Sequence, residues 1–292
     1  MHVLLNKNVG ATDYWRFPWL RFKGGYSVTW RPPIFQAALL RKQPDLKFPF
    51  IQTPDKPGPE VYYPLEEAPG ISRQFLAVRN VDDALAFAND YGLMGLDAVP
   101  RYSGHRAELD QNGENLNDWF LEATELGQAY EVWDLIAGDV GGLREIVVGT
   151  AQGMPVIWPK TGRRGRSFRT PHWVQPAPGL KPEEVLALAK GFIAERYNRK
   201  MMQMASPMLL LDAKGAFHSY NRPSSLLGAL WLEFGEIASG SRKQVLCESC
   251  GQWMDVTDNR SHKRKHDRCV LREKMARLRQ KQRDGRAETN TP

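Results

Sequence analysis

The chain has 292 residues, of which 42% are hydrophobic and 25% are charged, and this composition is typical of a folded globular protein. No apolar run approaches the roughly 18–20 residues that cross a membrane, and the first residues lack the apolar stretch of a secretory signal. The chain contains three cysteines, too few for a disulfide framework, which favours a reducing compartment. We therefore expect a cytoplasmic protein with no membrane contact.

The net charge of +7 is distributed unevenly along the chain. Residues 242–292 contain 14 Lys and Arg against 7 Asp and Glu, whereas residues 1–241 contain 26 of each. The whole excess of positive charge therefore lies in the C-terminal segment. Such a segment is typical of proteins that bind nucleic acid, because neutralising phosphates supplies much of the binding free energy. A solvated basic tail is the alternative.

Residues 1 to about 78 are rich in Pro and aromatic residues and lack helical periodicity. Three stretches there have a composition typical of strands: 26–30, 48–52 and 61–63. Pro and Gly separate these stretches. The pattern predicts short strands joined by loops in this part of the chain.

Four segments before residue 240 have the apolar spacing or the end signals of helices: 81–91, 115–136, 182–204 and 224–237. Gly92 follows the first and suits a helix C-terminus. Pro182 opens the third and is followed by two glutamates, which suit the N-terminal end of the helix dipole. The fourth is almost wholly apolar, so we expect it to be buried.

Two pairs of strands are predicted between these helices. Residues 154–158 and 167–170 have strand composition on either side of an arginine-rich loop. Residues 207–212 and 216–220 form a second candidate hairpin.

All three cysteines lie within a short C-terminal stretch, as thiolates recruited to hold a metal must. Cys247, Cys250, His266 and Cys269 give the pattern C-x2-C-x15-H-x2-C, and His262 is an alternative fourth ligand. His266 is favoured because H-x2-C repeats the spacing of C-x2-C. Two short chelating pairs separated by a loop are what a tetrahedral structural zinc site requires, so we expect one structural Zn²⁺ per chain.

The residues around these ligands resemble the C-terminal zinc finger of the bacterial CGNR family. Members have a cysteine pair, an aromatic-x-Asp-x-Ser/Thr run with Asn-Arg-Ser, and a second cysteine pair that heads an Arg-rich helix. The matching residues here are Trp253, Asp255, Thr257, Asn259, Arg260 and Ser261. Residues 273–276 stand where the family has its fourth cysteine and its Gly-Asn-Arg, so His266 or His262 has to complete the site. The resemblance implies a bacterial DNA-binding protein similar to a transcription regulator.

Residues 270–283, which follow the last cysteine, have good helix-forming composition. Leu271, Met275 and Leu278 form a narrow apolar stripe at helical spacing, and arginines occupy other faces. A helix held by a metal ligand in this way suits phosphates or a DNA major groove, and a solvated capping helix is the alternative. The candidate nucleic-acid contacts are Arg260, Lys263, Arg264, Lys265, Arg268, Arg272, Arg277, Arg279, Lys281 and Arg283.

Weaker candidates lie in the rest of the chain. Residues 160–169 contain arginines spaced by glycines, which suit a nucleic-acid backbone or an ordinary hairpin tip. Asp97, His105 and Glu108 are candidates for an acid–base pair or a metal-dependent nuclease site. The chain has no nucleophile elbow, phosphate loop, HExxH or dinucleotide motif, so we expect a binding protein rather than an enzyme.

Together these patterns predict an α+β protein. Residues 1–240 form a mostly helical core domain with short N-terminal and central β-hairpins, residues 241–285 a zinc finger ending in a basic helix, and residues 286–292 a disordered tail. We expect the finger to bind nucleic acid, in particular DNA, while the core domain binds a protein partner or a second copy of the chain. The alternatives are a protein-interaction module of a defence or toxin–antitoxin system, in which zinc is purely structural, and a nuclease with its site in residues 1–240.

Overall fold

The computed structural model describes residues 17–22, 25–31, 47–54, 58–96, 113–149, 154–160, 175–176, 179–211, 217–257 and 264–289. Within this part, seven α-helices and several short antiparallel strand pairs are present, which confirms the predicted α+β class. The chain divides into two compact units, Met1–Gly235 and Glu236–Pro292, and each is described by itself. Among the described helices, none combines the length and the apolar character that a membrane crossing would need.

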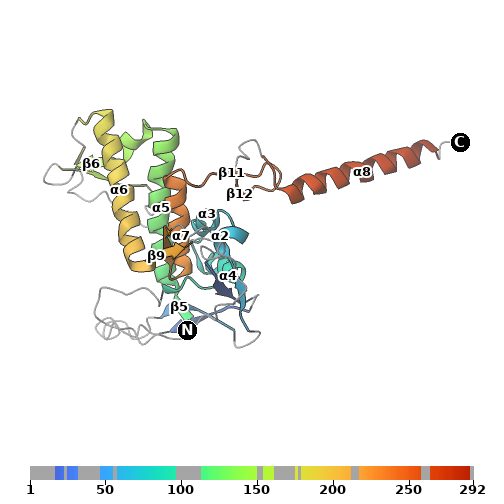
Figure 1. Cartoon of the computed structure of the whole chain (residues 1–292), viewed down its shortest axis with the longest axis horizontal. Helices are drawn as coiled ribbons and strands as arrows, with labels where there is room; N and C mark the ends of the chain where they lie inside the picture. The colour runs from blue at the N-terminus through green and yellow to red at the C-terminus, as the bar shows by residue number, and fades with distance from the viewer. Residues whose placement is uncertain are drawn as a thin grey trace. The chain divides into compact units, whose positions relative to one another are not determined.

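Three long helices form the centre of the first unit: α5 (Leu116–Gly138), α6 (Pro182–Met204) and α7 (Leu226–Ala238). Figure 1 shows them side by side in green, yellow and orange. At the start of α5, the side chain of Asn115 accepts a hydrogen bond of 2.9 Å from the amide of Asn117, which satisfies one of the N–H groups left free at a helix start. All three helices were predicted, and their bounds agree with the sequence patterns to within two residues.

Helix α7 approaches α6 closely at two glycines. A Cβ atom on Gly228 would lie 2.6 Å from the carbonyl oxygen of Met204, and one on Gly235 would lie 2.3 Å from the ring of Tyr197. Neither position therefore has room for a side chain, and the two glycines allow the helix backbones to pack at short distance.

The core is built largely from aromatic side chains. Trp119 of α5 packs edge-on against Phe75 and Phe87, with ring centroids 6.2 and 6.1 Å away. Tyr130 of α5 meets Phe234 of α7 at 4.8 Å. Rings at these distances and tilts combine burial of large apolar areas with favourable edge-to-face contacts, so they account for much of the stability of this unit.

Two buried carboxylates tie segments of the first unit together. Glu233 of α7, which has no exposed surface, accepts hydrogen bonds from the amides of Gly70 and Ser72 at 2.7 and 2.9 Å and one from the Ser72 hydroxyl. Glu114 accepts from three consecutive amides that begin at Met94, and from the indole N–H of Trp119 at 2.7 Å. A buried carboxylate is tolerated where donors surround it in this way.

Four small sheets complete the first unit. Their antiparallel pairs are β1 (Trp19–Arg21) with β4 (Glu60–Tyr62); β3 (Phe48–Gln52) with β2 (Ser27–Arg31) and β5 (Gly113–Asn115); β6 (Val147–Gly149) with β7 (Pro155–Ile157) and β8 (Gln175–Pro176); and β9 (Ala205–Leu211) with β10 (Phe217–Pro223). Strands β2, β3 and β4 and the 207–220 hairpin were predicted, whereas β1 was not. The predicted strand at 167–170 lies outside the described residues.

Three shorter helices precede α5. The predicted 81–91 helix is α4 (Val81–Tyr91), which ends before Gly92 at a φ of 86°. In contrast, the expectation of strands and loops alone before residue 78 was wrong, because α2 (Pro64–Glu67) and α3 (Ile71–Phe75) lie there. Helices of four and five residues are too short to show a period and are held by burial of side chains such as Ile71, which has no exposed surface.

The second unit contains a hairpin and one long helix. Strands β11 (Gln244–Leu246) and β12 (Trp253–Asp255) pair antiparallel, and helix α8 runs from Asp267 to Thr289. The helix begins before the segment predicted from residue 270, and it includes residues 286–289 of the predicted tail. The turn between the two strands carries two of the three cysteines.

Candidate metal centre

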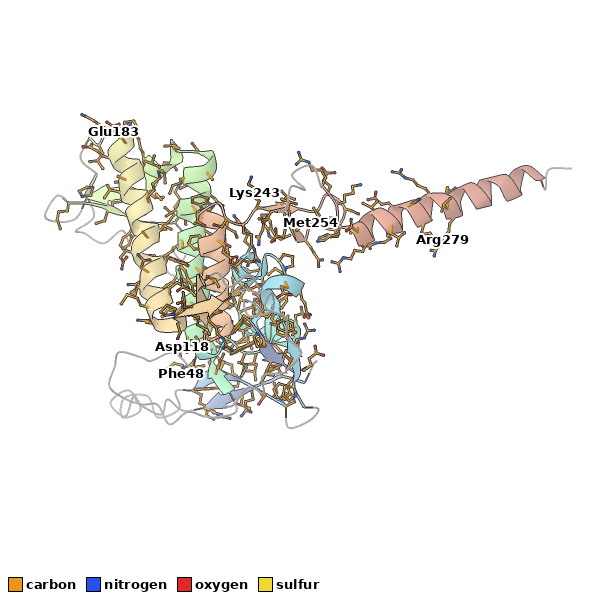
Figure 2. The ribbon with its side chains drawn as sticks, in the orientation of Figure 1. Phe48, Asp118, Glu183, Lys243, Met254 and Arg279 are labelled. Atoms are coloured by element: carbon orange, nitrogen blue, oxygen red, sulfur yellow. The ribbon has the colours of Figure 1, made fainter. Side chains whose placement is uncertain are left out.

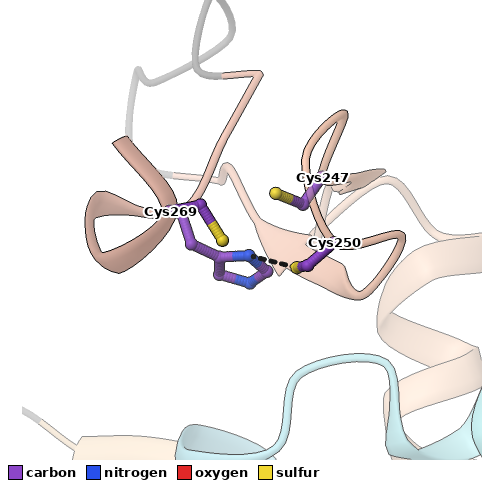
Figure 3. Close-up of side chains that lie close together, drawn as sticks. Cys247, Cys250 and Cys269 are labelled. Atoms are coloured by element: carbon purple, nitrogen blue, oxygen red, sulfur yellow. Dashed lines mark hydrogen bonds between the residues drawn. The ribbon is translucent and has the colours of Figure 1, made fainter. Parts of the chain in front are cut away.

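The structure brings together the four residues of the C-x2-C-x15-H-x2-C pattern (Figure 3). One ligand atom from each of Cys247, Cys250, His266 and Cys269 lies within 4.8 Å of all the others. The Cys250 Sγ atom is 3.4 Å from Nδ1 of His266, close to the roughly 3.6 Å edge that sulfur and nitrogen ligands span in a tetrahedral zinc site. The alternative ligand, His262, lies outside the described residues.

The first cysteine pair sits on a tight turn between the two strands. The amide of Cys247 donates to the carbonyl of Gln252 at 2.9 Å, and the amide of Gly251 donates back to the carbonyl of Cys247 at 2.8 Å. Gly251 has a φ of 68°, a left-handed conformation that glycine adopts without steric cost. This turn points both thiols to the same side, which is what a two-residue chelating pair needs.

The ring of His266 is oriented by a main-chain hydrogen bond. Its Nε2 atom lies 3.2 Å from the carbonyl oxygen of Trp253. Because a carbonyl can only accept, this contact fits the tautomer with its proton on Nε2, in which the Nδ1 lone pair faces the thiols. Metal-binding histidines are held in one tautomer by partners of this kind, so the arrangement favours a ligand role for Nδ1.

The second chelating pair lies at the start of α8. The carbonyl of His266 accepts hydrogen bonds from the amides of Cys269 and Val270, at 2.9 and 3.0 Å, and so begins the first turn of the helix. Cys269 is fully buried in that turn. The Arg272 guanidinium donates a hydrogen bond to its sulfur at 3.6 Å.

Hydrogen bonds set the protonation of the first cysteine pair. Desolvation raises the pKa of the Cys247 thiol, but backbone amides, among them those of His266 and Ser249, outweigh it and lower the pKa from 9.0 to about 5. The amide of Gln252 lowers the pKa of Cys250, but desolvation and the neighbouring thiols raise it above the usual value. A metal binds thiolates, so the lowered pKa of Cys247 favours metal binding, whereas Cys250 has to release its proton when the metal binds.

The centre has very little apolar support. In the part of the second unit that the structure describes, the buried core consists of Cys247, Cys269, Met254 and Val256, with Val245 packed against it. Two of its four members are thus candidate ligands rather than ordinary core residues. Units with so few apolar contacts need a staple such as a structural metal, because burial alone does not offset the loss of chain entropy.

Residues matching the CGNR pattern stabilise the hairpin. The Asp255 carboxylate accepts hydrogen bonds from the amide and hydroxyl of Thr257, at 2.8 and 2.5 Å, and pairs with Arg242 at 3.1 Å. The Thr257 hydroxyl in turn accepts from the amide of Lys243 at 3.0 Å. These local roles, and that of the Trp253 carbonyl, were not predicted, because several of the partners are main-chain groups, which every residue type carries.

The predicted nucleic-acid contacts occupy different surroundings. Arg264, Arg277 and Arg279 are exposed. Lys265 forms an ion pair of 2.8 Å with Glu273, and Arg268 donates to the side-chain oxygen of Gln252. Arg260 and Lys263 lie outside the described residues, and Lys281 and Arg283 lie on α8 beyond the last side chain that the structure describes.

The weaker candidates lie almost wholly outside the described residues. This holds for the predicted acid–base group of Asp97, His105 and Glu108 and for the loop 161–169. Lys160, at the start of that loop, is described, and it pairs with Glu145.

Comparisons with protein-family models, curated proteins and solved structures find no match for this chain. The resemblance to the CGNR finger therefore stays a prediction. What the chain itself shows is a Cys3His cluster compatible with a single metal ion such as zinc. Four protein ligands fill a tetrahedral coordination shell and leave no position for a substrate, which is typical of a structural site and not of a catalytic one.

Proposed function

We propose that this protein is a zinc-finger protein that binds nucleic acid, DNA in particular, in the manner of a transcription regulator. One Zn²⁺ per chain, held by Cys247, Cys250, His266 and Cys269, orders the second unit. The observation that carries the proposal is the position of Cys269 in the first turn of α8. A metal ligand there fixes the start of a helix whose described side chains include the exposed Arg277 and Arg279.

The charge distribution supports the same function. The finger and its helix hold the entire positive excess of the chain. Cations on an ordered helix neutralise phosphates and release condensed counterions, so they produce affinity that depends steeply on salt.

Two measurements on the purified full-length protein test the proposal. Elemental analysis should find one zinc per chain. Fluorescence anisotropy with a labelled DNA duplex should show binding that weakens as salt rises, and the Arg277→Ala and Arg279→Ala variants should each reduce the slope of log K against log salt by about one. Removing the same number of charges with Lys190→Ala and Arg144→Ala, at exposed positions of the first unit, should leave the slope unchanged.

Binding that is absent, or that does not respond to salt, would contradict the proposal. Zinc would then serve as a purely structural element of a protein-interaction module. A protein purified without metal, with its hairpin nevertheless ordered, would contradict the assignment of the centre itself.

A further inference from the structure

Helix α8 carries an exposed apolar stripe that does not face the metal centre. Leu271, Met275 and Leu278, here named the apolar ridge, are 61%, 44% and 47% exposed, whereas Cys269 on the same helix is fully buried. At about 100° per residue, the ridge lies within an arc of about 60°, and Leu271 is about 200° around the helix from Cys269. The ridge therefore points away from the small core of its own unit.

Positive side chains border the apolar ridge on both sides. Arg268, Arg272 and Arg279 form a first basic edge, and Lys274 and Arg277 form a second, each roughly 70–100° from the ridge. All five are exposed, although Arg268 also donates to Gln252 and Arg272 to the sulfur of Cys269. The sequence continues the same spacing at Arg283 and Lys281. Figure 2 shows Arg279 on the part of α8 beyond the finger.

We infer that α8 lies in the major groove of double-stranded DNA with the apolar ridge toward the base edges, and that the ridge selects thymine. This inference rests on the proposed function. The major groove of B-DNA is about 12 Å wide and admits an α-helix, so the two basic edges face the two phosphate strands while the ridge faces the floor. The major groove of A-form RNA is too deep and narrow to admit the helix in this way.

The chemistry of the ridge decides which base it favours. Leu side chains offer no hydrogen bond to a base edge and Met offers only a weak sulfur acceptor, and the apolar group that the major groove presents is the C5-methyl of thymine. Burying one such methyl group raises affinity about fourfold. The ridge runs over seven residue-to-residue steps of the helix, or about 10 Å, which corresponds to about three base pairs.

An anionic membrane and a second copy of the chain fit this face less well. Interfacial helices place aromatic and large apolar residues along their length, whereas α8 contains no aromatic residue and its ridge ends at Leu278, although its cations continue. A coiled coil requires three or four apolar heptads, but Gln282 and Gly285 stand where the repeat would continue. Two basic edges would also repel those of a second copy.

The test compares two duplexes that differ by the thymine methyl group alone. Zinc-loaded full-length protein is titrated into alternating dA–dT and dA–dU duplexes of equal length, and binding is followed by fluorescence anisotropy. The protein should bind the dA–dT duplex more tightly, by about fourfold for each methyl group that the ridge buries. Met275→Ala combined with Leu278→Ala, which leaves only Leu271 of the ridge, should reduce this preference at least fourfold and leave the salt slope unchanged. Arg279→Ala should weaken binding to both duplexes equally and keep the preference.

Equal affinity for the two duplexes would overturn the inference and leave the proposed function standing, because phosphate binding does not need the methyl group. A preference of unchanged size in the Met275→Ala, Leu278→Ala protein would also overturn it. A protein without thymine preference would be tested for binding to phosphatidylglycerol vesicles and for self-association. If the Met275→Ala, Leu278→Ala variant abolished either of these, the ridge would be assigned to a membrane or to a second copy of the chain. No binding to either duplex would remove both proposals. Zinc content measured for each variant shows that the finger has kept its fold.

Discussion

The two units of this protein use different means to hold a fold together. The first unit buries large side chains such as Trp119, Trp231 and Phe234 completely, and it satisfies its buried carboxylates with several donors each. Among its described side chains, the second unit buries four, of which two are cysteines of the candidate metal centre. Apolar burial at about 25 cal/mol per Å² stabilises a large core and leaves a small one marginal. The comparison implies that the first unit folds without metal and that the second does not.

The largest expected effect is therefore loss of the metal centre. Cys269→Ser, or removal of zinc with a chelator, should remove about 10 kcal/mol or more of folding free energy from the second unit and leave the first unit intact. Hydrogen exchange resolved along the chain should show fast exchange in β11, β12 and the first turn of α8, with unchanged protection in α5 and α7. Slow exchange in β11 and β12 after zinc removal would show that the comparison is wrong.

The next effect concerns the first unit. Glu233→Ala should destabilise it by about 3 kcal/mol, because the amides of Gly70 and Ser72 lose their acceptor in a buried site. Urea denaturation followed by tryptophan fluorescence measures the change. Glu233→Gln keeps one acceptor oxygen and should cost less, while the zinc content of both variants stays at one per chain. Equal stability of the Ala variant and the unaltered protein would show that the carboxylate does not hold this part of the core.

Weakening the contact between α6 and α7 should have a smaller effect on stability, and a second glycine on α6 provides the control. Gly235→Ala should destabilise the first unit by about 1–2 kcal/mol, because the added methyl group overlaps the ring of Tyr197. Gly191→Ala on α6, where no atom lies within 4 Å of the added Cβ, should instead stabilise the unit by up to about 1 kcal/mol. The same substitution thus changes the free energy of unfolding in opposite directions at two helical glycines. If the midpoint temperature of thermal unfolding shifted in the same direction for both variants, close packing would be excluded as the reason that residue 235 is a glycine.

Residue types predicted the parts of this protein that depend on local chemistry. Pro182 indicated the start of α6, and the spacing of three cysteines and His266 indicated the ligand cluster. The parts that depend on distant contacts were missed. Helices α2 and α3 are too short for a periodic pattern, and β6 pairs with strands on both sides, although its three residues show no alternation. The buried Glu114 and Glu233 had no sequence signal, because most of their donors are main-chain amides.

The smallest effect tests how the second unit couples its hairpin to the metal. Asp255→Ala removes the acceptor for the amide and hydroxyl of Thr257 and one partner of Arg242, at an exposed position, and should cost about 1 kcal/mol. In a unit that folds only with metal, folding free energy is part of the binding free energy. Zinc affinity, measured by competition with a chromophoric chelator, should therefore fall about fivefold. Asp284→Ala, which removes a carboxylate near the end of α8, should leave the affinity unchanged. Unaltered zinc affinity in the Asp255→Ala protein would mean that the hairpin is ordered before the metal binds.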